Sequence, residues 1–206
     1  MMRYTLRPME PGDVPAVAAI DRISFPTPWP ASAFQRELRR GRARYHVLLM
    51  PEDGAPWGSD RGWERWLRRK FDATKGSRVV GYVGFRWQGH EGHITTIAVR
   101  PDSRGRGFGD LLLLVAIDKM LALGLEVVTL EMRPSNGAAY QLYRKFGFEV
   151  TGRDPGYYRD GEDAWVMAAD VRSEVSQRRL ASRRRALEER LRRAEIVVGR
   201  RDVVGP

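Results

Sequence analysis

The chain has 206 residues and a formal net charge of +10, with 42% hydrophobic and 30% charged residues, as expected for a globular protein with one main domain. It contains no cysteine, which excludes disulfides, cysteine-based metal sites and a thiol nucleophile, and which agrees with a cytoplasmic location. Apolar runs are too short to span a membrane, so we expect no membrane contact and no signal peptide.

Hydrophobic periodicity and the positions of glycine and proline predict a mixed α/β fold around one sheet. In chain order, strands are expected at 3–9, 43–50, 77–88, 90–100, 125–133 and 148–153, with a last strand within 156–170. Helices are expected within 10–25 and at 31–41, 108–123, 135–147 and 171–196. Strands dominate before residue 100, and helices alternate with strands after it.

Residues 51–77 interrupt this pattern with a Gly- and Pro-rich segment followed by "GWERWLRRKFDA". The large apolar side chains of that stretch fall on one helical face: Trp63, Trp66, Leu67 and Phe71. We interpret 51–77 as an inserted helical segment between two strands. Its apolar face would pack on its own domain, cover a cleft or form a dimer contact.

A glycine-rich turn, "RPDSRGRGFGD" at 100–110, joins an apolar strand to an apolar helix. Glycine permits close approach of the backbone to a ligand, and the free N–H groups at a helix start attract anions, so the turn predicts a phosphate site. It does not end in Gly-Lys-Ser/Thr, which excludes a Walker loop, and it fits the dinucleotide pattern Gly-x-Gly-x-x-Gly poorly. What remains is Arg-x-x-Gly-x-Gly at Arg104, Gly107 and Gly109, or a turn with no ligand at all.

This pattern resembles the GNAT superfamily of acetyl-CoA-dependent N-acetyltransferases. Two further stretches, "SFPTPWPASAFQREL" at 24–38 and "LEMRPSNGAAYQLYRKFGFEVTGRDPGYYRDGEDAWVM" at 130–167, are similar to its ribosomal-protein-alanine (RimI-like) branch. The resemblance covers about 3–170 apart from the insert. It implies the GNAT acyl-CoA N-acyltransferase fold over a domain at 1–170, with acetyl-CoA as co-substrate and no metal. The implied acceptor is a protein N-terminus, in particular a ribosomal protein that begins with alanine.

By the same resemblance, the turn and the strand before it contact acetyl-CoA. The implied contacts are Ile97, Ala98, Val99, Arg104, Gly105, Arg106, Gly107, Phe108, Gly109, Asp110 and Asn136. Backbone amides of the turn would hold the pyrophosphate, and an N–H of Ile97 or Val99 would face the thioester oxygen. Asn136 is equally suited to cap the helix that it precedes.

Acetyl transfer to an amine needs a proton acceptor for the nitrogen and a proton donor for the leaving sulfur. Glu131 interrupts an apolar strand, and the resemblance implies that it is the base; alternatively it forms an ion pair with Arg133 on the same face. Partial burial is expected to raise the pKa of Glu131, against the effect of Arg133. Tyr143 is implied as the acid, although a helical tyrosine beside Leu142 and Phe146 also fits a core.

Four residues are expected to border the acceptor channel: Trp29, Arg133, Tyr157 and Tyr158. The aromatic members could instead serve only to pack loops. The three histidines, His46, His90 and His93, have no metal-like partners in the sequence. We interpret them as structural or solvent-facing.

The extension at 171–206 carries 11 arginines and 5 acidic residues, whereas 1–170 is nearly balanced. It is predicted to be a long basic helix that either caps the domain or contacts ribosomal RNA through 172–201. Two other functions stay open. One is acetylation of a small-molecule amine, and the other is a non-catalytic CoA-binding module associated with ribosomes or RNA.

Overall fold

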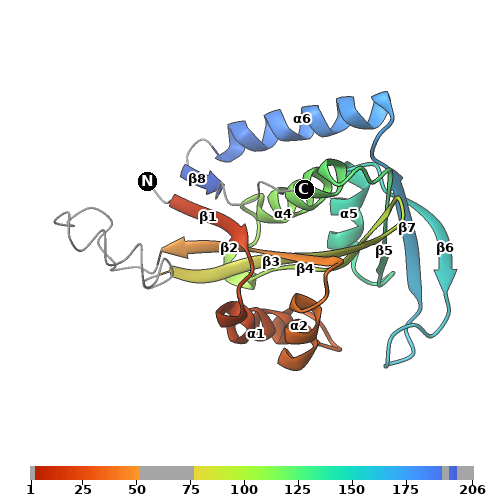
Figure 1. The fold of residues 1–206 in the computed structure, drawn as a ribbon. Helices are drawn as coiled ribbons and strands as arrows, with labels where there is room; N and C mark the ends of the chain where they lie inside the picture. The colour runs from red at the N-terminus through yellow and green to blue at the C-terminus, as the bar shows by residue number, and fades with distance from the viewer. Residues whose placement is uncertain (1–2, 52–76, 192–194, 199–206) are drawn as a thin grey trace.

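The computed structural model describes residues 3–51, 77–191 and 195–198, which form a mixed sheet covered by helices on both faces (Figure 1). The sheet has eight strands in the order β6-β7-β5-β4-β3-β2-β1-β8. Their bounds are β1 Arg3–Pro8, β2 Ala43–Pro51, β3 Ser77–Gln88, β4 Glu91–Val99, β5 Val127–Met132, β6 Glu149–Asp154, β7 Ala164–Asp170 and β8 Glu195–Val198. The helices are α1 Val14–Ser24, α2 Ala31–Leu38, α4 Phe108–Ala122, α5 Gly137–Lys145 and α6 Glu174–Leu191. The inserted helix predicted within 51–77 lies outside the described residues, apart from the ends of β2 and β3.

The predicted α/β fold is confirmed, with strands close to their expected bounds. The first four strands pair antiparallel in chain order, as short connections require. Strand β5 then pairs parallel to β4 after the crossover through α4, and β7 pairs antiparallel to both β5 and β6. The sheet is therefore parallel at one internal position, between β4 and β5.

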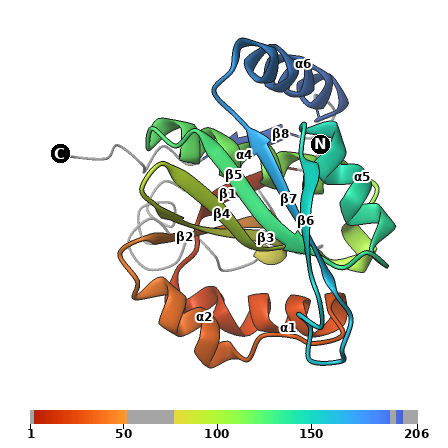
Figure 2. The ribbon, with the colours of Figure 1, turned by 90° about the vertical axis from the view of Figure 1, so that its right-hand side faces the viewer.

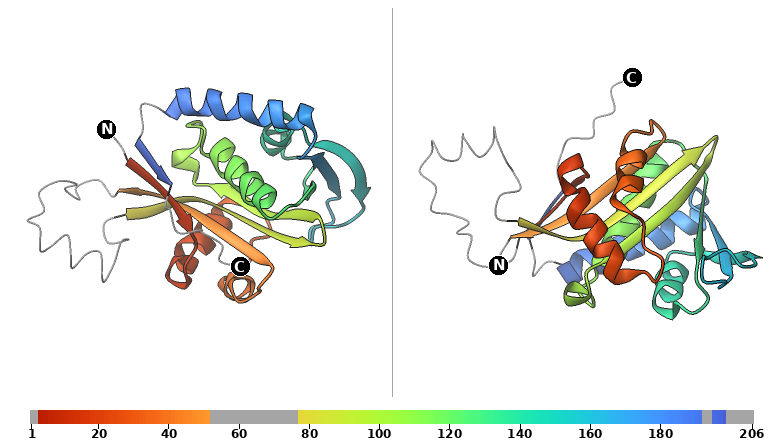
Figure 3. Two further views of the ribbon diagram at one scale, coloured as in Figure 1. Left: turned by 45° about the horizontal axis from the view of Figure 1, so that its top comes forward. Right: turned by 90° about the horizontal axis from the view of Figure 1, so that it is seen from below.

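Helices α1 and α2 cover one face of the sheet, and α4 and α5 cover the other (Figures 1 and 3). On the first face, Val17 and Ile20 of α1 and Phe34 of α2 pack in one apolar cluster with Tyr82 of β3. The second face holds the larger cluster, which α4 dominates. Within the described ranges, no helix combines the length and the apolar composition needed to cross a bilayer.

Helix α6 lies over α4, so that α4 is enclosed between the sheet and a further helix (Figure 2). This explains why "FGDLLLLVAI" is apolar on nearly every side, with Leu112, Leu113 and Ile117 fully buried. The sparse apolar positions of α6, Leu180, Leu187 and Leu191, belong to the same buried cluster. The leucines thus attach α6 to the main core, while most of its arginines stay exposed.

The prediction of one helix over 171–196 is wrong at its end. Helix α6 stops at Leu191, and Glu195–Val198 forms β8, which pairs parallel with β1. The sequence of β8, "EIVV", is rich in β-branched residues that favour strands, and β1 would otherwise present an open edge on this side. Tertiary pairing therefore overrides continuation of the helix.

Gly84 makes room for a ring from the neighbouring strand. It pairs with Tyr45 of β2, and a Cβ on Gly84 would overlap the Tyr45 ring. We expect Gly84→Ala to lower the free energy of unfolding by about 1–3 kcal/mol, because the displaced ring sits in a closely packed core. Urea denaturation measures the change, with Gly41→Ala as the control, since a Cβ there meets no atom within 4 Å. Equal stability of the two variants would contradict this account.

Candidate active site

The sheet opens between β4 and β5. These strands pair at three successive positions, the last being His93 with Thr129, and no described strand pairs with β4 on this side beyond it. A cleft of about 370 Å³ lies at this opening and is lined by residues of both strands. Because its lining also includes residues of α5 and of the α1–α2 connection, the cleft runs from one face of the sheet to the other.

The glycine turn lies where β4 gives way to α4. Gly105 has a φ of +75° and Gly107 a φ of +90°. This left-handed conformation is unfavourable for residues other than glycine. Gly107 is the N-cap of α4, so the amides that follow it have no partner one turn earlier in the helix. Gly109 and Val99 line the cleft. The turn thus offers backbone amides beside the cleft, as a pyrophosphate requires.

The side chains of the turn are engaged elsewhere. Phe108 is buried against Tyr4, with ring centroids 4.6 Å apart, so only the backbone of Phe108 can meet a ligand. The charged members bind other parts of the protein: Arg104 donates to the Val99 carbonyl, Arg106 to the Tyr4 hydroxyl, and Asp110 pairs with Lys145. Contact with acetyl-CoA through these side chains stays a prediction.

The remaining predicted cofactor contacts lie in the cleft. Ile97, Ala98 and Val99 line it from β4, and Asn136 lines it from the start of α5. Asn136 also caps α5, as the sequence predicts, because its side chain accepts a hydrogen bond from the Ala139 amide at 3.1 Å. The cap fixes this side chain beside the opening.

Glu131 lies on β5 two residues beyond the last pair with β4, and it lines the cleft. Its carboxylate is 3.2 Å from Nε2 of His93, while Nδ1 of His93 is 3.1 Å from the Thr129 hydroxyl. The hydrogen bond from His93 lowers the pKa of Glu131, and it outweighs the raising effect of burial. The expected rise of this pKa is therefore wrong. His93, interpreted from the sequence as structural or solvent-facing, lines the cleft and contacts the candidate base.

Tyr143 lies on α5 and lines the cleft, although only 6% of the residue is exposed. Burial raises the pKa of the Tyr143 phenol well above its usual value. The side chain belongs to the core and also borders the opening, so the structure agrees with the core interpretation and places the phenol at the cleft. The raised pKa keeps the phenol protonated but makes it a weaker acid, and its role as the proton donor stays a prediction.

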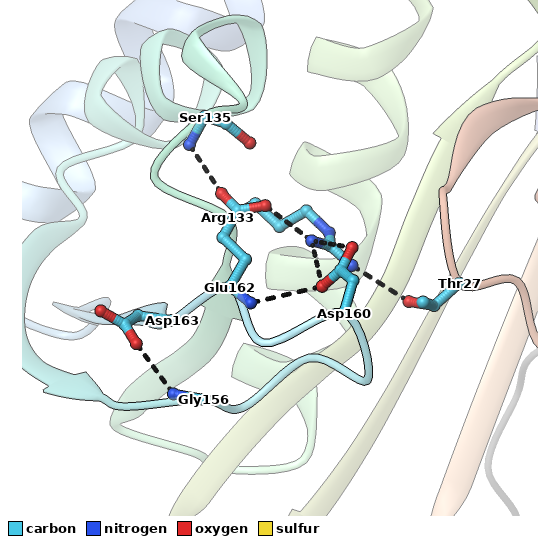
Figure 4. A network of polar contacts seen from close by, with 7 residues as sticks. All are labelled: Thr27, Arg133, Ser135, Gly156, Asp160, Glu162 and Asp163. Carbon is cyan, nitrogen blue, oxygen red and sulfur yellow. Dashed lines mark hydrogen bonds and ion pairs between the residues drawn. The ribbon is translucent and has the colours of Figure 1, made fainter.

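Arg133 binds acidic residues of the β6–β7 connection instead of Glu131 (Figure 4). Its guanidinium donates to Asp160 at 3.0 Å, to Glu162 at 2.6 Å and to the Thr27 hydroxyl at 3.1 Å. The predicted ion pair between Arg133 and Glu131 is thus replaced by this network. Hydrogen bonds from Arg133 lower the pKa of Asp160, and those from Ser135 and Arg133 lower the pKa of Glu162.

The predicted aromatic residues border the same end of the cleft. Tyr158 stacks on the Arg133 guanidinium, whose carbon lies 3.8 Å from the ring centroid. Tyr157, half exposed, hydrogen-bonds Glu131, and Trp29 lies across the cleft on the α1–α2 connection. These three residues and Arg133 line the cleft together, and their contact with an acceptor stays a prediction.

Asp21 of α1 is a cleft residue that the sequence analysis missed. Its carboxylate is nearly fully buried, accepts the Trp29 amide at 2.5 Å and accepts the Tyr82 hydroxyl. Burial raises the pKa of Asp21, and both hydrogen bonds oppose the rise. Asp21 thereby fixes the segment that presents Trp29. A lone acidic residue on an apolar helix face was the available signal.

Residues 14–148, which include the parted strands and the glycine turn, match the Acetyltransferase (GNAT) family. The chain belongs to this family and is an N-acetyltransferase.

Several proteins similar to this chain are N-alpha-acetyltransferases by name. The N-alpha-acetyltransferase RimI of Mycobacterium tuberculosis is 35% identical over 69% of this chain and 76% of its own, and an N-alpha-acetyltransferase of Sulfurisphaera tokodaii is 31% identical over 82% and 93%. The crystal structure of the ribosomal-protein-S18-alanine N-acetyltransferase from Escherichia coli superposes with a TM-score of 0.63 at 26% identity, covering 82% of this chain and 94% of that one. Arabidopsis thaliana NAA60 in complex with acetyl-CoA shares the fold, with a TM-score of 0.63 at 17% identity over 82% and 99%.

Proposed function

We propose that the enzyme transfers acetyl from acetyl-CoA to the N-terminal α-amino group of a protein, and that this protein is a ribosomal protein that begins with alanine. The observation that carries the proposal is the position of Glu131, a partly buried carboxylate at the point where β4 and β5 part. The relatives that act on protein N-termini support the acceptor class. A ribosomal acceptor would place the enzyme in the cytoplasm.

Different residues of the cleft would bind the cofactor, accept the proton of the amine and donate a proton to the sulfur. The glycine turn would hold the pyrophosphate, and the free edge of β4 at Ile97–Val99 would align the pantetheine arm, so that the thioester lies in the opening. When the amine attacks the thioester carbonyl, its nitrogen becomes acidic, and Glu131 takes the proton. Tyr143, from the side of α5, donates a proton to the departing sulfur.

The acceptor side combines aromatic and charged residues. Asp21, Glu37 and Glu131 line the cleft together with Arg86 and Arg133, and Glu37 pairs with Arg40 at 2.9 Å. We therefore assign the attraction of a protonated amine to Glu131, at the opening between β4 and β5. Tyr157 and Trp29 come from two connections, β6–β7 and α1–α2, that face each other across the opening. We infer that the first residues of a polypeptide enter between these connections. Arg133 then acts by holding both connections in place, through Thr27 on one side and Glu162 on the other.

The test is acetylation of a peptide beginning Ala-Arg, with the same peptide formylated at its N-terminus as the matched control. Mass spectrometry should place the acetyl group on the α-nitrogen of the first peptide, and the second should stay unmodified. Activity confined to polyamines or aminoglycosides would favour a small-molecule acetyltransferase. CoA binding with no acceptor turned over would favour a non-catalytic module.

Contact between ribosomal RNA and 172–201 stays a prediction, and the structure changes how it must be tested. Deleting the segment would remove Leu180 and Leu187 from the core, so loss of binding would be ambiguous. Arg183 and Arg185 are exposed on α6, and reversing both to glutamate leaves the apolar face intact. The contact would be contradicted if this double variant sedimented with ribosomal subunits as wild type does, and if the sedimentation of both proteins did not depend on salt concentration.

A further inference from the structure

The C-terminal end of α6 lies directly on the glycine turn. Arg190 donates a hydrogen bond from Nη2 to the Gly105 carbonyl at 2.6 Å, across 85 residues of sequence. A Cβ on Gly107 would lie 3.3 Å from Leu187 and 3.4 Å from Arg190, so these two side chains close the outer side of the turn. Gly107 is buried although it belongs to a loop.

Other contacts hold α6 at a fixed position along its length. Near its start, Arg179 packs against Gly147, at the end of α5. At its middle, Arg184 pairs with Asp118 of α4 at 2.7 Å. The buried leucines run between these points, and β8 follows the helix into the sheet. Arg190 is therefore presented to the turn by a helix with little freedom to shift.

The hydrogen bond to Gly105 determines which way the next amide points. Every peptide bond in the described residues is trans, so the C=O of Gly105 and the N–H of Arg106 point in opposite directions. Holding the carbonyl toward α6 turns that N–H away from α6. Glycine allows the peptide plane to rotate at little cost, so an unheld turn could place a carbonyl oxygen where an anion must bind.

We propose that Arg190 is a positioning residue of the acetyl-CoA site, which makes the C-terminal helix a working part of the cofactor-binding turn. The proposal rests on the proposed function for the identity of the ligand. It assigns Arg190 to the carbonyl of the turn and not to a phosphate of the ligand. Arg190 lowers the cost of binding because the turn already has its bound orientation.

The experiment measures CoA binding by titration calorimetry for wild type, Arg190→Met and Arg190→Lys. Loss of this charge-assisted hydrogen bond should weaken CoA binding about tenfold in Arg190→Met, and lysine, which can also donate to a carbonyl, should restore most of the affinity. Arg178→Met is the matched control, because Arg178 is exposed on the same helix and pairs only locally, with Glu174. Amide exchange over 105–109 should quicken in Arg190→Met alone.

Dephospho-CoA keeps the pyrophosphate and lacks the 3′-phosphate, so it separates positioning from direct contact with the 3′-phosphate. Quicker amide exchange over 105–109 in Arg190→Met without any ligand separates positioning from contact with the pyrophosphate. If Arg190 acts through the turn, Arg190→Met should weaken CoA and dephospho-CoA equally. Weaker binding of CoA alone would show that Arg190 meets the 3′-phosphate, and wild-type affinity of Arg190→Met for both ligands would show no role; each result overturns the proposal. No acceptor is needed for these measurements. Failure to acetylate an N-terminus would therefore count against the proposed function and leave this inference standing.

Discussion

Replacing Glu131 by glutamine is expected to lower kcat by about 10²- to 10⁴-fold, the range for removal of a general base. The amide has nearly the same shape as the carboxylate and keeps an oxygen for the His93 contact, but it cannot accept the proton that the attacking nitrogen must lose. The affinity for CoA should change little, because Glu131 lies beside His93 near the start of β4, whereas the glycine turn follows the end of that strand. Steady-state kinetics and calorimetry measure the two quantities.

Glu149→Gln is the matched control for that variant. Glu149 begins the exposed edge strand β6, so its replacement removes one carboxylate without touching the cleft. A kcat for Glu131→Gln within tenfold of the control would exclude Glu131 as the base. Loss of CoA affinity in parallel with kcat would instead indicate a damaged fold.

The lowered pKa of Glu131 fixes the direction of the pH dependence. Since hydrogen bonding from His93 keeps the pKa of Glu131 below the usual value of a glutamate, the carboxylate is ionised throughout the neutral range. The fall of kcat/KM on acidification from about pH 8 should therefore follow protonation of the peptide amine, whose pKa is about 8. In His93→Phe, Glu131 stays partly buried but loses the hydrogen bond that most strongly favours its charged form, so the pKa of Glu131 should rise. A carbon-13 titration of the Glu131 carboxyl group checks the shift.

Local patterns in the sequence predict most of the sheet and the turn. The continuous run of β-branched and aromatic residues in "SRVVGYVGFRWQ" and the glycines at 105 and 107 are properties of neighbouring residues, and β3 and the turn appear where these patterns place them. The apolar sequence of α4 also held an unused signal for the docking of α6, because α4 is too apolar for a helix with one face in water. Strand β8 was missed because four residues after a basic helix carry too short a pattern to outweigh its continuation.

The polar contacts of the site depend on pairings that no local pattern contains. Glu131 and Arg133 share a strand face, which predicts an ion pair, but His93 reaches Glu131 through the β4–β5 register. Arg133 instead finds Asp160 and Glu162, 27 and 29 residues later, because the β6–β7 connection folds back over the end of β5. The sequence offers several acidic residues as possible partners for His93 and Arg133. Which of them forms the contact depends on the strand register and on the path of the loops in the folded chain.

Replacing Arg133 by methionine is expected to lower kcat/KM for the peptide about 10- to 100-fold, although Arg133 takes no part in the chemistry. Methionine retains the apolar length of the side chain but removes every bond to Asp160, Glu162 and Thr27, so the two connections around the acceptor lose their common support. The loss should appear mainly in KM for the peptide, and KM for acetyl-CoA should stay near wild type. Lysine in place of Arg133 should restore only part of kcat/KM for the peptide, because an ammonium group cannot bind several acceptors in the planar arrangement of a guanidinium.

The pH dependence of stability distinguishes this network from a purely catalytic role. The pKa values of Asp160 and Glu162 are lowered in the folded protein, so their contribution to stability is present above the unfolded values near pH 4 and is lost as the pH falls through the folded ones. The melting temperature of wild type should therefore exceed that of Arg133→Met by a constant margin from pH 6 to 8, and the margin should shrink below pH 4. Arg153→Met is the control, since Arg153 pairs with Asp163 at the exposed end of the same connection. Arg153→Met should leave KM for the peptide near wild type. An equal rise of this KM in Arg153→Met and Arg133→Met would contradict the role of Arg133, because any loss of order in the β6–β7 connection would then be enough to weaken peptide binding.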